Sequence, residues 1–238
     1  DDMKSGNLIA LYALSALAEA GVLGRASYRI VFTGDVESPG EPLDVVRRDL
    51  IEAGKWADYA LGFEAGAYDR ASDGSITTAY ATTARRSSSD WMVEVTGKQA
   101  HSSGIFSDRV GAGAVFEAAR ILNAFYESVR GEKYLTFNAG SILAGTDVNY
   151  DVAQTRGTTF GKTNVVPSHA IIHGGIRTIS DEQLERARQK MREIVADNLP
   201  GTSAIITFGQ GYPAMAPTEG NAKLQRLLSE IIFDLGGQ

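Results

Sequence analysis

The chain has 238 residues, of which 43% are hydrophobic and 22% charged, and these fractions exclude a disordered or collagen-like protein. The net charge of −6 and the pI near 5.2 argue against nucleic-acid binding, since a phosphate-binding surface normally carries an excess of Lys and Arg. The longest apolar run, Leu8 to Ala18, is about half the length that a bilayer requires, so no membrane partner is expected. The absence of cysteine removes disulfides and thiolate metal sites, and it leaves the compartment open between cytoplasmic and secreted or periplasmic.

The first part of the chain alternates between helical and strand-like segments. Helices are predicted at Lys4–Ala20 and Leu43–Ala53, and strands at Tyr28–Thr33 and Tyr59–Phe63. Helix, strand, helix, strand is the order of a parallel α/β sheet. Residues 68–89 are rich in Ala, Ser, Thr and Gly, which predicts loop and linker.

The following segments have a different order, β-α-β-β-α-β, which is the ferredoxin-like α+β pattern. The predicted elements are Trp91–Thr96, Arg109–Val129, Tyr134–Leu143, Val165–Thr178, Asp181–Asn198 and Ala204–Phe208, with a Gly-rich interruption before the fourth and a last helix at Ala222–Leu235. We therefore predict an α/β domain in two parts, residues 1–85 and 209–238, with an inserted domain at residues 86–208. The alternative is one continuous α+β domain.

Carboxylates stand at the ends of the predicted strands in the first part. They are Asp2, the pair Asp35 and Glu37, and Glu64. Ligands gather at the carboxyl ends of strands in open α/β sheets, and carboxylates suit divalent cations. The acids therefore predict a metal site, although Asp and Glu are also common in turns.

The chain has three histidines, His101, His169 and His173. The run "HAIIH" is β-branched and follows Pro167, so it predicts a strand, on which the two histidines are roughly 13 Å apart and cannot share an ion. His101 follows a strand in "VTGKQAHSSG", where an exposed imidazole either donates to an oxyanion or is simply solvated. Arg177 either clamps a carboxylate or is an exposed structural Arg.

Five stretches carry a resemblance to a known family. They are "DDMKSGN", "TGDVESPG", "ADYALGFE", "VTGKQAHSSG" and "GKTNVVPSHAIIHGGIR", in this order. Together they resemble the dinuclear zinc family of glutamate carboxypeptidase, aminoacylase, acetylornithine deacetylase and succinyl-diaminopimelate desuccinylase. The resemblance runs from the first residue to about Pro217. It implies a zinc exopeptidase-like catalytic domain interrupted by a ferredoxin-like lid that forms a homodimer.

The resemblance also implies roles for single residues. Asp2 matches the carboxylate that bridges two zinc ions, and Glu37 and Glu64 match a ligand of each ion, with Co2+ or Mn2+ as alternative metals. His101 matches a histidine that reaches into the partner's active site and polarises the scissile carbonyl. Asn164 and Arg177 match residues that bind the substrate's carbonyl and carboxylate. The chemistry would be attack of a zinc-bridged water on an amide carbonyl.

The sequence departs from the family pattern in three places. It contains neither the His-x-Asp motif expected before Asp2 nor the late His, so we expect the chain to be a fragment that lacks both termini. Its carboxylate ligands alone should bind zinc poorly, because zinc prefers imidazole nitrogen. Val36 stands where the family has the Glu that acts as general base, and valine accepts no proton. This loss predicts a slow enzyme, since general acid–base catalysis is worth about 10² to 10⁴ in rate.

The leading hypothesis is therefore a zinc-dependent metallopeptidase or amidohydrolase that acts on a small peptide or an N-acyl amino acid, with activity impaired by Val36. One alternative is a non-catalytic dimeric homologue that binds a metal or ligand. Another is a dimerising fragment with no site at all. The substrate within the carboxypeptidase, aminoacylase or deacetylase classes does not follow from the sequence.

Overall fold

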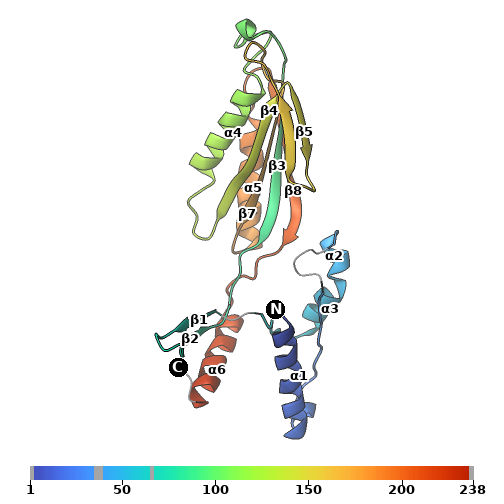
Figure 1. The fold of residues 1–238 in the computed structure, drawn as a ribbon, viewed down its shortest axis with the longest axis vertical. Coiled ribbons are helices and arrows are strands. Elements are labelled where there is room, and N and C mark those ends of the chain that lie inside the picture. The colour runs from blue at the N-terminus through green and yellow to red at the C-terminus, as the bar shows by residue number, and fades with distance from the viewer. Residues whose placement is uncertain (1–2, 35–39, 65–66, 236–238) are drawn as a thin grey trace. The chain divides into compact units, whose positions relative to one another are not determined.

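The computed structural model describes residues 3–34, 40–64 and 67–235 (Figure 1). The chain divides into two compact units. Unit 1 comprises residues 1–82 and 224–238, and unit 2 comprises residues 83–223. Unit 2 is therefore inserted in unit 1, as the sequence predicts for its second set of elements.

Unit 2 is built on a four-stranded antiparallel sheet with strand order β4-β7-β3-β8. The strands are β3 (Ser88–Gly97), β4 (Thr136–Gly145), β7 (His169–Arg177) and β8 (Thr202–Tyr212). The helices α4 (Ala114–Ser128) and α5 (Asp181–Ala196) cover one face of this sheet (Figure 1). The order of these six elements confirms the predicted β-α-β-β-α-β fold.

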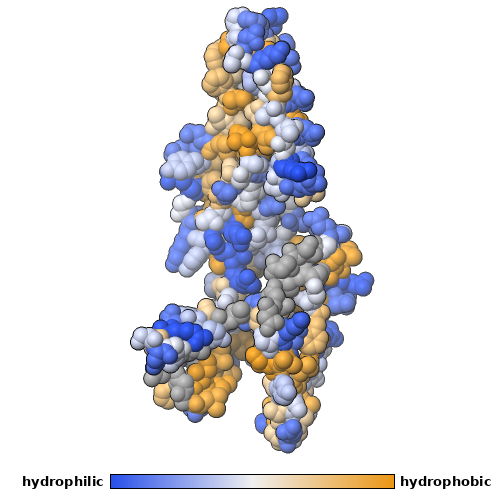
Figure 2. Space-filling view, viewed as in Figure 1, coloured by the Kyte–Doolittle hydropathy of each residue, from blue (hydrophilic) through white to orange (hydrophobic). Residues whose placement is uncertain are grey.

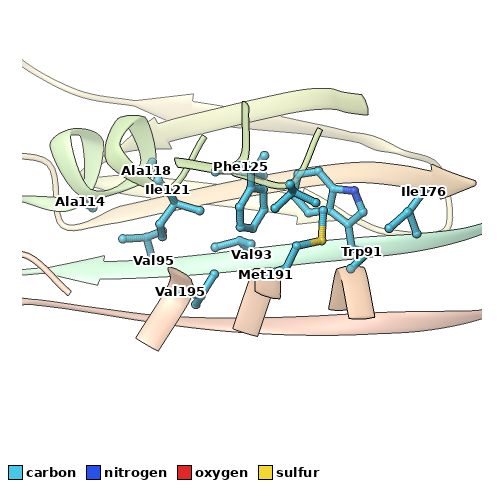
Figure 3. Close-up of a cluster of buried hydrophobic side chains, with 14 of the residues drawn as sticks. Trp91, Val93, Val95, Ala114, Ala118, Ile121, Phe125, Ile176, Met191 and Val195 are labelled. Atoms are coloured by element: carbon cyan, nitrogen blue, oxygen red, sulfur yellow. The ribbon is translucent and has the colours of Figure 1, made fainter. Parts of the chain in front are cut away.

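Alternation of apolar and polar residues in β3 places the core of unit 2. Trp91, Val93 and Val95 are buried, whereas the residues between them, Met92 and Glu94, lie on the opposite face of the sheet. In Figure 3 the buried side chains of β3 lie among those of α4 and α5. The rings of Trp91 and Phe125 meet edge to face with centroids 5.5 Å apart, an arrangement that aromatic pairs prefer. The sheet and both helices therefore share one apolar layer.

Helix α4 begins five residues later than the sequence predicts, at Ala114 rather than Arg109. Gly111 and Gly113 precede it with φ of +77°, a conformation that L side chains rarely adopt. A Cβ on Gly111 would also lie 2.0 Å from the carbonyl oxygen of Pro200. The two glycines thus keep the preceding segment outside the helix. Helix α5 begins where predicted, and the hydroxyl of its N-cap Ser180 accepts the Gln183 N–H at 3.2 Å.

The predicted Gly-rich interruption lies between β4 and β7, and it contains a hairpin that the sequence did not indicate. Strands β5 (Asp147–Asp151) and β6 (Arg156–Phe160) pair antiparallel and follow β4 directly. The base of the hairpin is tied to the end of β4 by the Thr159 hydroxyl, which donates to the Ala144 carbonyl at 2.7 Å. The Tyr150 hydroxyl lies 2.7 Å from Nδ1 of His173, on the face of the sheet away from the helices. The hairpin therefore covers part of that face.

Unit 1 contains helices and a small hairpin. Its elements are α1 (Lys4–Glu19), the 3-10 turn η1 (Leu23–Arg25), α2 (Leu43–Val46), α3 (Arg48–Trp56), β1 (Ala67–Arg70), β2 (Ile76–Tyr80) and α6 (Glu219–Asp234), which begins within unit 2. The predicted helices are confirmed, except that the second one is interrupted at Arg47.

The two predicted strands of unit 1 are wrong for the described residues. Residues 28–33 and 59–63 form no strand, because neither segment pairs in a sheet with another described segment, and β-branched composition alone does not make a strand. The predicted linker is also wrong in part, since residues 67–80 form the β1–β2 hairpin. Its signal was Asp73-Gly74, where Gly74 has φ of +85° and the Asp73 carboxylate accepts the Ser75 N–H.

Much of the apolar surface of unit 1 is exposed. Leu8 and Tyr12 of α1 are 54% and 73% exposed, and Leu227 and Phe233 of α6 are 52% and 76% exposed. Figure 2 shows both helices as largely apolar at the surface. The large cluster of buried apolar residues lies in unit 2, which therefore gains most of the free energy of apolar burial. Among the described residues, no helix is both long enough and apolar enough to span a bilayer.

Candidate functional site

The expected metal ligands are only partly visible. Asp2, Val36 and Glu37 lie outside the described residues. Glu64 is exposed and follows a segment without regular secondary structure rather than a strand. Within the described ranges, no three His, Asp or Glu side chains are grouped closely enough to hold a metal ion. The expected donors are all carboxylate oxygens, so these residues alone do not fit zinc, and no catalytic step through a metal follows from them.

His101 is held at the far end of β3, beyond Gly97. The Val166 N–H donates to the Ala100 carbonyl at 2.8 Å, and the Ser102 N–H donates to the Asn164 carbonyl at 2.9 Å. These two bonds fix the backbone on both sides of His101. The imidazole is exposed and caps the short 3-10 turn η2 (Ser102–Gly104), where its Nδ1 accepts the Ser103 N–H at 3.2 Å.

Asn164 lies beside His101. It belongs to the segment between β6 and β7, in which Val166 is 1% exposed and anchors the segment in the core of unit 2. The side chain of Asn164 is exposed, while its carbonyl binds the His101 loop as described above. The structure therefore brings together two of the three site residues predicted in the inserted domain.

Arg177 lies at the other end of the sheet. It is the last residue of β7 and pairs with Thr136 of β4, whereas His169, the first residue of β7, pairs with Thr96 next to Gly97. Eight residues at a rise of about 3.3 Å separate the two ends by roughly 26 Å. Arg177 within one chain is therefore too far from His101 and Asn164 to bind the same small substrate.

The backbone at Arg177 is fixed by a buried pair of hydroxyl residues. Ser87 and Thr178 are both 0% exposed, and their hydroxyl oxygens are 2.8 Å apart. The Thr178 N–H also donates to the Ser87 hydroxyl at 2.9 Å. Because buried hydroxyls are stable only when hydrogen-bonded, this pair holds the end of β7 firmly against the start of β3.

The histidines of β7 lie on a strand, as predicted, and do not share a site. His169 contacts the Ser168 hydroxyl at 2.9 Å. His173, whose side chain is 12% exposed, contacts Tyr150 through Nδ1 and lies 4.0 Å from the Asp90 carboxylate through Nε2. Sequence reasoning missed this cluster, because nothing in the spacing of Tyr150 and Asp90 indicates that they meet at His173.

Comparison with known proteins identifies unit 2. The sequence model of the M20 dimer family, described as the peptidase dimerisation domain, matches residues 83–203. This match covers β3 to α5 and the start of β8, and it includes both the His101 and Arg177 ends of the sheet. The chain therefore belongs to the family of peptidase dimerisation domains. A search of curated protein sequences finds no match.

Several solved structures are similar to the chain at low identity. An aminobenzoyl-glutamate utilization protein from Klebsiella pneumoniae is 20% identical, with 57% of this chain and 31% of that one covered and a TM-score of 0.42. Aminopeptidase PepT from Bacillus cereus is 20% identical, with 63% and 36% covered and a TM-score of 0.46. A tripeptidase from Staphylococcus aureus is 18% identical, with 66% and 37% covered and a TM-score of 0.47. The chain thus spans about a third of the length of these structures.

Proposed function

We propose that unit 2 pairs two copies of the chain and that the pair completes the site of an amide-bond hydrolase. The observation that carries the proposal is the placement of His101 and Arg177 at opposite ends of one sheet in a peptidase dimerisation domain. A second chain related by a two-fold axis can supply His101 and Asn164 to a site that contains Arg177 of the first chain. One domain then serves two sites.

The edge of β4 is the surface that best suits a second copy. The residues Val115, Ala119, Leu122 and Tyr126 recur at helical spacing along the flank of α4. This flank lies opposite Arg120, whose guanidinium donates to the Ile194 carbonyl of α5. It is therefore turned toward the β4 edge, where Ile142 is 52% exposed. An unpaired strand edge beside an apolar helix flank favours pairing with a copy of itself.

The edge of β8 is different, because charged groups flank it. Arg188 and Arg192 both stack on the ring of Phe208, and Glu185 pairs with the two guanidiniums at 3.0 and 3.9 Å. Ile205 is the exposed isoleucine of this edge, at 68%. Charges beside an edge strand discourage pairing, so β8 is the outer edge of the proposed dimer.

A matched pair of variants tests the interface. Ile142→Lys and Ile205→Lys place the same charge on an exposed isoleucine of the two edge strands. We expect Ile142→Lys to raise the dimer dissociation constant by at least about tenfold, since each ammonium would lose water in the interface, and Ile205→Lys to leave it unchanged. Sedimentation velocity over a concentration series measures both. Dissociation by Ile205→Lys instead of Ile142→Lys would assign the interface to β8.

The proposed reaction is hydrolysis of a peptide or N-acyl amino acid with Zn2+, and with Co2+ or Mn2+ as alternative metals. Asp2, Glu37 and Glu64 are the proposed metal ligands, and further nitrogen ligands are required because the three are carboxylates. His101 would polarise the amide carbonyl, Asn164 would bind it, and Arg177 would pair with the substrate carboxylate through its planar fork. Residues 1–85 and 209–238 would form the catalytic domain around the lid at residues 86–208. The proposed products are an amine and a carboxylate.

Complementation between two inactive variants tests the shared site. In the full-length protein, His101→Ala and Arg177→Ala should each abolish most hydrolysis of N-acyl amino acids. An equimolar mixture of the two variants should regain about a quarter of the parent activity, because half of the dimers are mixed and each mixed dimer has one intact site of two. No recovery after verified subunit exchange would mean that each site takes His101 and Arg177 from the same chain, which would refute the proposal.

The residue at position 36 sets the level of activity that the complementation assay can detect. Replacing Val36 by Glu in the full-length protein with added Zn2+ should raise the rate by about 10² to 10⁴, because it restores a proton acceptor. Equal activity in both forms would mean that another group is the base. Absence of activity in both would favour the non-catalytic metal- or ligand-binding homologue.

A further inference from the structure

The side chain of His101 makes two contacts through a single ring nitrogen. Nδ1 accepts the backbone N–H of Ser103 at 3.2 Å and lies 2.8 Å from the Ser103 hydroxyl oxygen. A backbone amide can only donate, so Nδ1 must present its lone pair. A proton on Nδ1 would point at the amide hydrogen of Ser103, which makes that tautomer unfavourable.

The protonation of the other nitrogen follows from this contact. In neutral imidazole one nitrogen carries the proton and the other accepts, so an accepting Nδ1 places the proton on Nε2. The hydroxyl of Ser103 reinforces this arrangement when it donates to Nδ1. The hydrogen bonds at Ala100 and Ser102 fix the backbone on both sides of His101. The position of the imidazole is therefore set by this backbone and by the contacts of Nδ1.

We propose that Ser103 is a positioning residue that holds His101 as the Nε2–H tautomer, so that Nε2–H donates to the carbonyl oxygen of an amide substrate. The inference rests on the proposed function of His101 and adds the reason why its Nε2 carries a proton and can donate a hydrogen bond. A donor already oriented toward the oxygen where negative charge develops stabilises the transition state without further reorganisation. With the other tautomer, Nε2 would be an acceptor and would repel that oxygen.

Nitrogen-15 spectra of the imidazole in the full chain test the tautomer without substrate or metal. With the imidazole neutral, the spectra should show an unprotonated Nδ1 and a protonated Nε2. Ser103→Ala keeps the amide but removes the hydroxyl, so the population of the Nδ1–H tautomer should rise by about fivefold, as expected for loss of one hydrogen bond. Ser103→Thr should restore the parent spectrum, and Ser102→Ala in the same turn is the control. A dominant Nδ1–H tautomer in the parent chain would overturn the inference.

An activity measurement on the full-length protein in the Val36→Glu background links the tautomer to the reaction. Ser103→Ala should lower kcat and kcat/KM by the same factor, about fivefold or less, because the affected interaction forms in the transition state. Rescue by Ser103→Thr separates this role from a general loss of folding. If His101→Ala keeps full activity, the proposed function of His101 fails, whereas an Nδ1–H spectrum contradicts the role of Ser103 whatever the activity.

Discussion

The ion pair between Glu117 and Arg120 gives the sharpest stability prediction. Glu117 is 0% exposed, and Arg120 binds it through Nε and through Nη2, at 2.6 Å for the shortest contact. The same carboxylate accepts the Leu199 N–H at 2.9 Å, beyond the end of α5. This one side chain therefore joins α4 to the segment that leads from α5 into β8.

Replacing Glu117 by Gln keeps the volume of the side chain but removes its charge. One amide oxygen cannot accept from Arg120 and Leu199 as the carboxylate does, and the new amide hydrogens face other donors. Breaking a buried ion pair on one side costs about 3–5 kcal/mol, so we expect unit 2 to lose about 3 kcal/mol. With a urea dependence of about 2–3 kcal/mol per M, the midpoint should fall by about 1 M.

Tryptophan fluorescence can follow this unfolding. The chain has two tryptophans, and Trp56→Phe leaves Trp91, which lies in the core of unit 2, as the only reporter. The matched control is Glu127→Gln, because Glu127 in the last turn of α4 and Arg130 just beyond the helix have the same spacing but are 58% and 52% exposed, with a distance of 3.9 Å between the charged groups. The control should change stability by less than about 0.5 kcal/mol. Equal midpoints for the two variants would refute the argument from burial.

Two further predictions concern polar contacts that fix the loops of unit 2. The pKa of Glu132 is lowered by hydrogen bonds from Gln183 and then Arg186, so its contribution to stability is present above the pKa of an unfolded Glu and is lost as the pH falls toward the lower folded value. In urea titrations at falling pH, Glu132→Gln should therefore lose less stability than the parent chain does, by less than about 1 kcal/mol because the Glu132 side chain is 47% exposed and screened by water. An equal loss in both proteins would contradict this. Tyr150→Phe removes the hydroxyl that contacts His173, so amide hydrogen exchange at residues 147–160 should quicken by about fivefold while β3 keeps its protection.

Local patterns predicted the inserted domain well, because its elements carry their own signals. The alternation in β3 and the Ser180 cap of α5 depend on residues close together in the chain, and the structure reproduces both. The start of α4 was harder, since the close approach of Gly111 to Pro200 joins residues far apart in sequence. The strands predicted in unit 1 failed for a related reason. A strand needs a neighbour, and no property of residues 28–33 reveals whether one is present.

The candidate site was also predictable from the sequence only in part. His101, Asn164 and Arg177 could be named from the resemblance, but the sequence did not show that Arg177 lies at the opposite end of the sheet. The register between β3 and β7 decides this, and register comes from packing on the shared core. The contact of Ser103 with His101 is local, and the cap position after a strand could have revealed it.

In the proposed dimer, the separation of His101 from Arg177 would make activity depend on the concentration of the chain. When every site needs residues from two chains, a solitary chain is inert, and the number of working sites grows with the square of the chain concentration at high dilution. Newly synthesised chains would be inactive until they form dimers. The length of β7, about 26 Å from its eight residue steps, keeps the two residues apart within one chain. Activity would therefore begin only when two chains assemble, without a separate regulatory subunit.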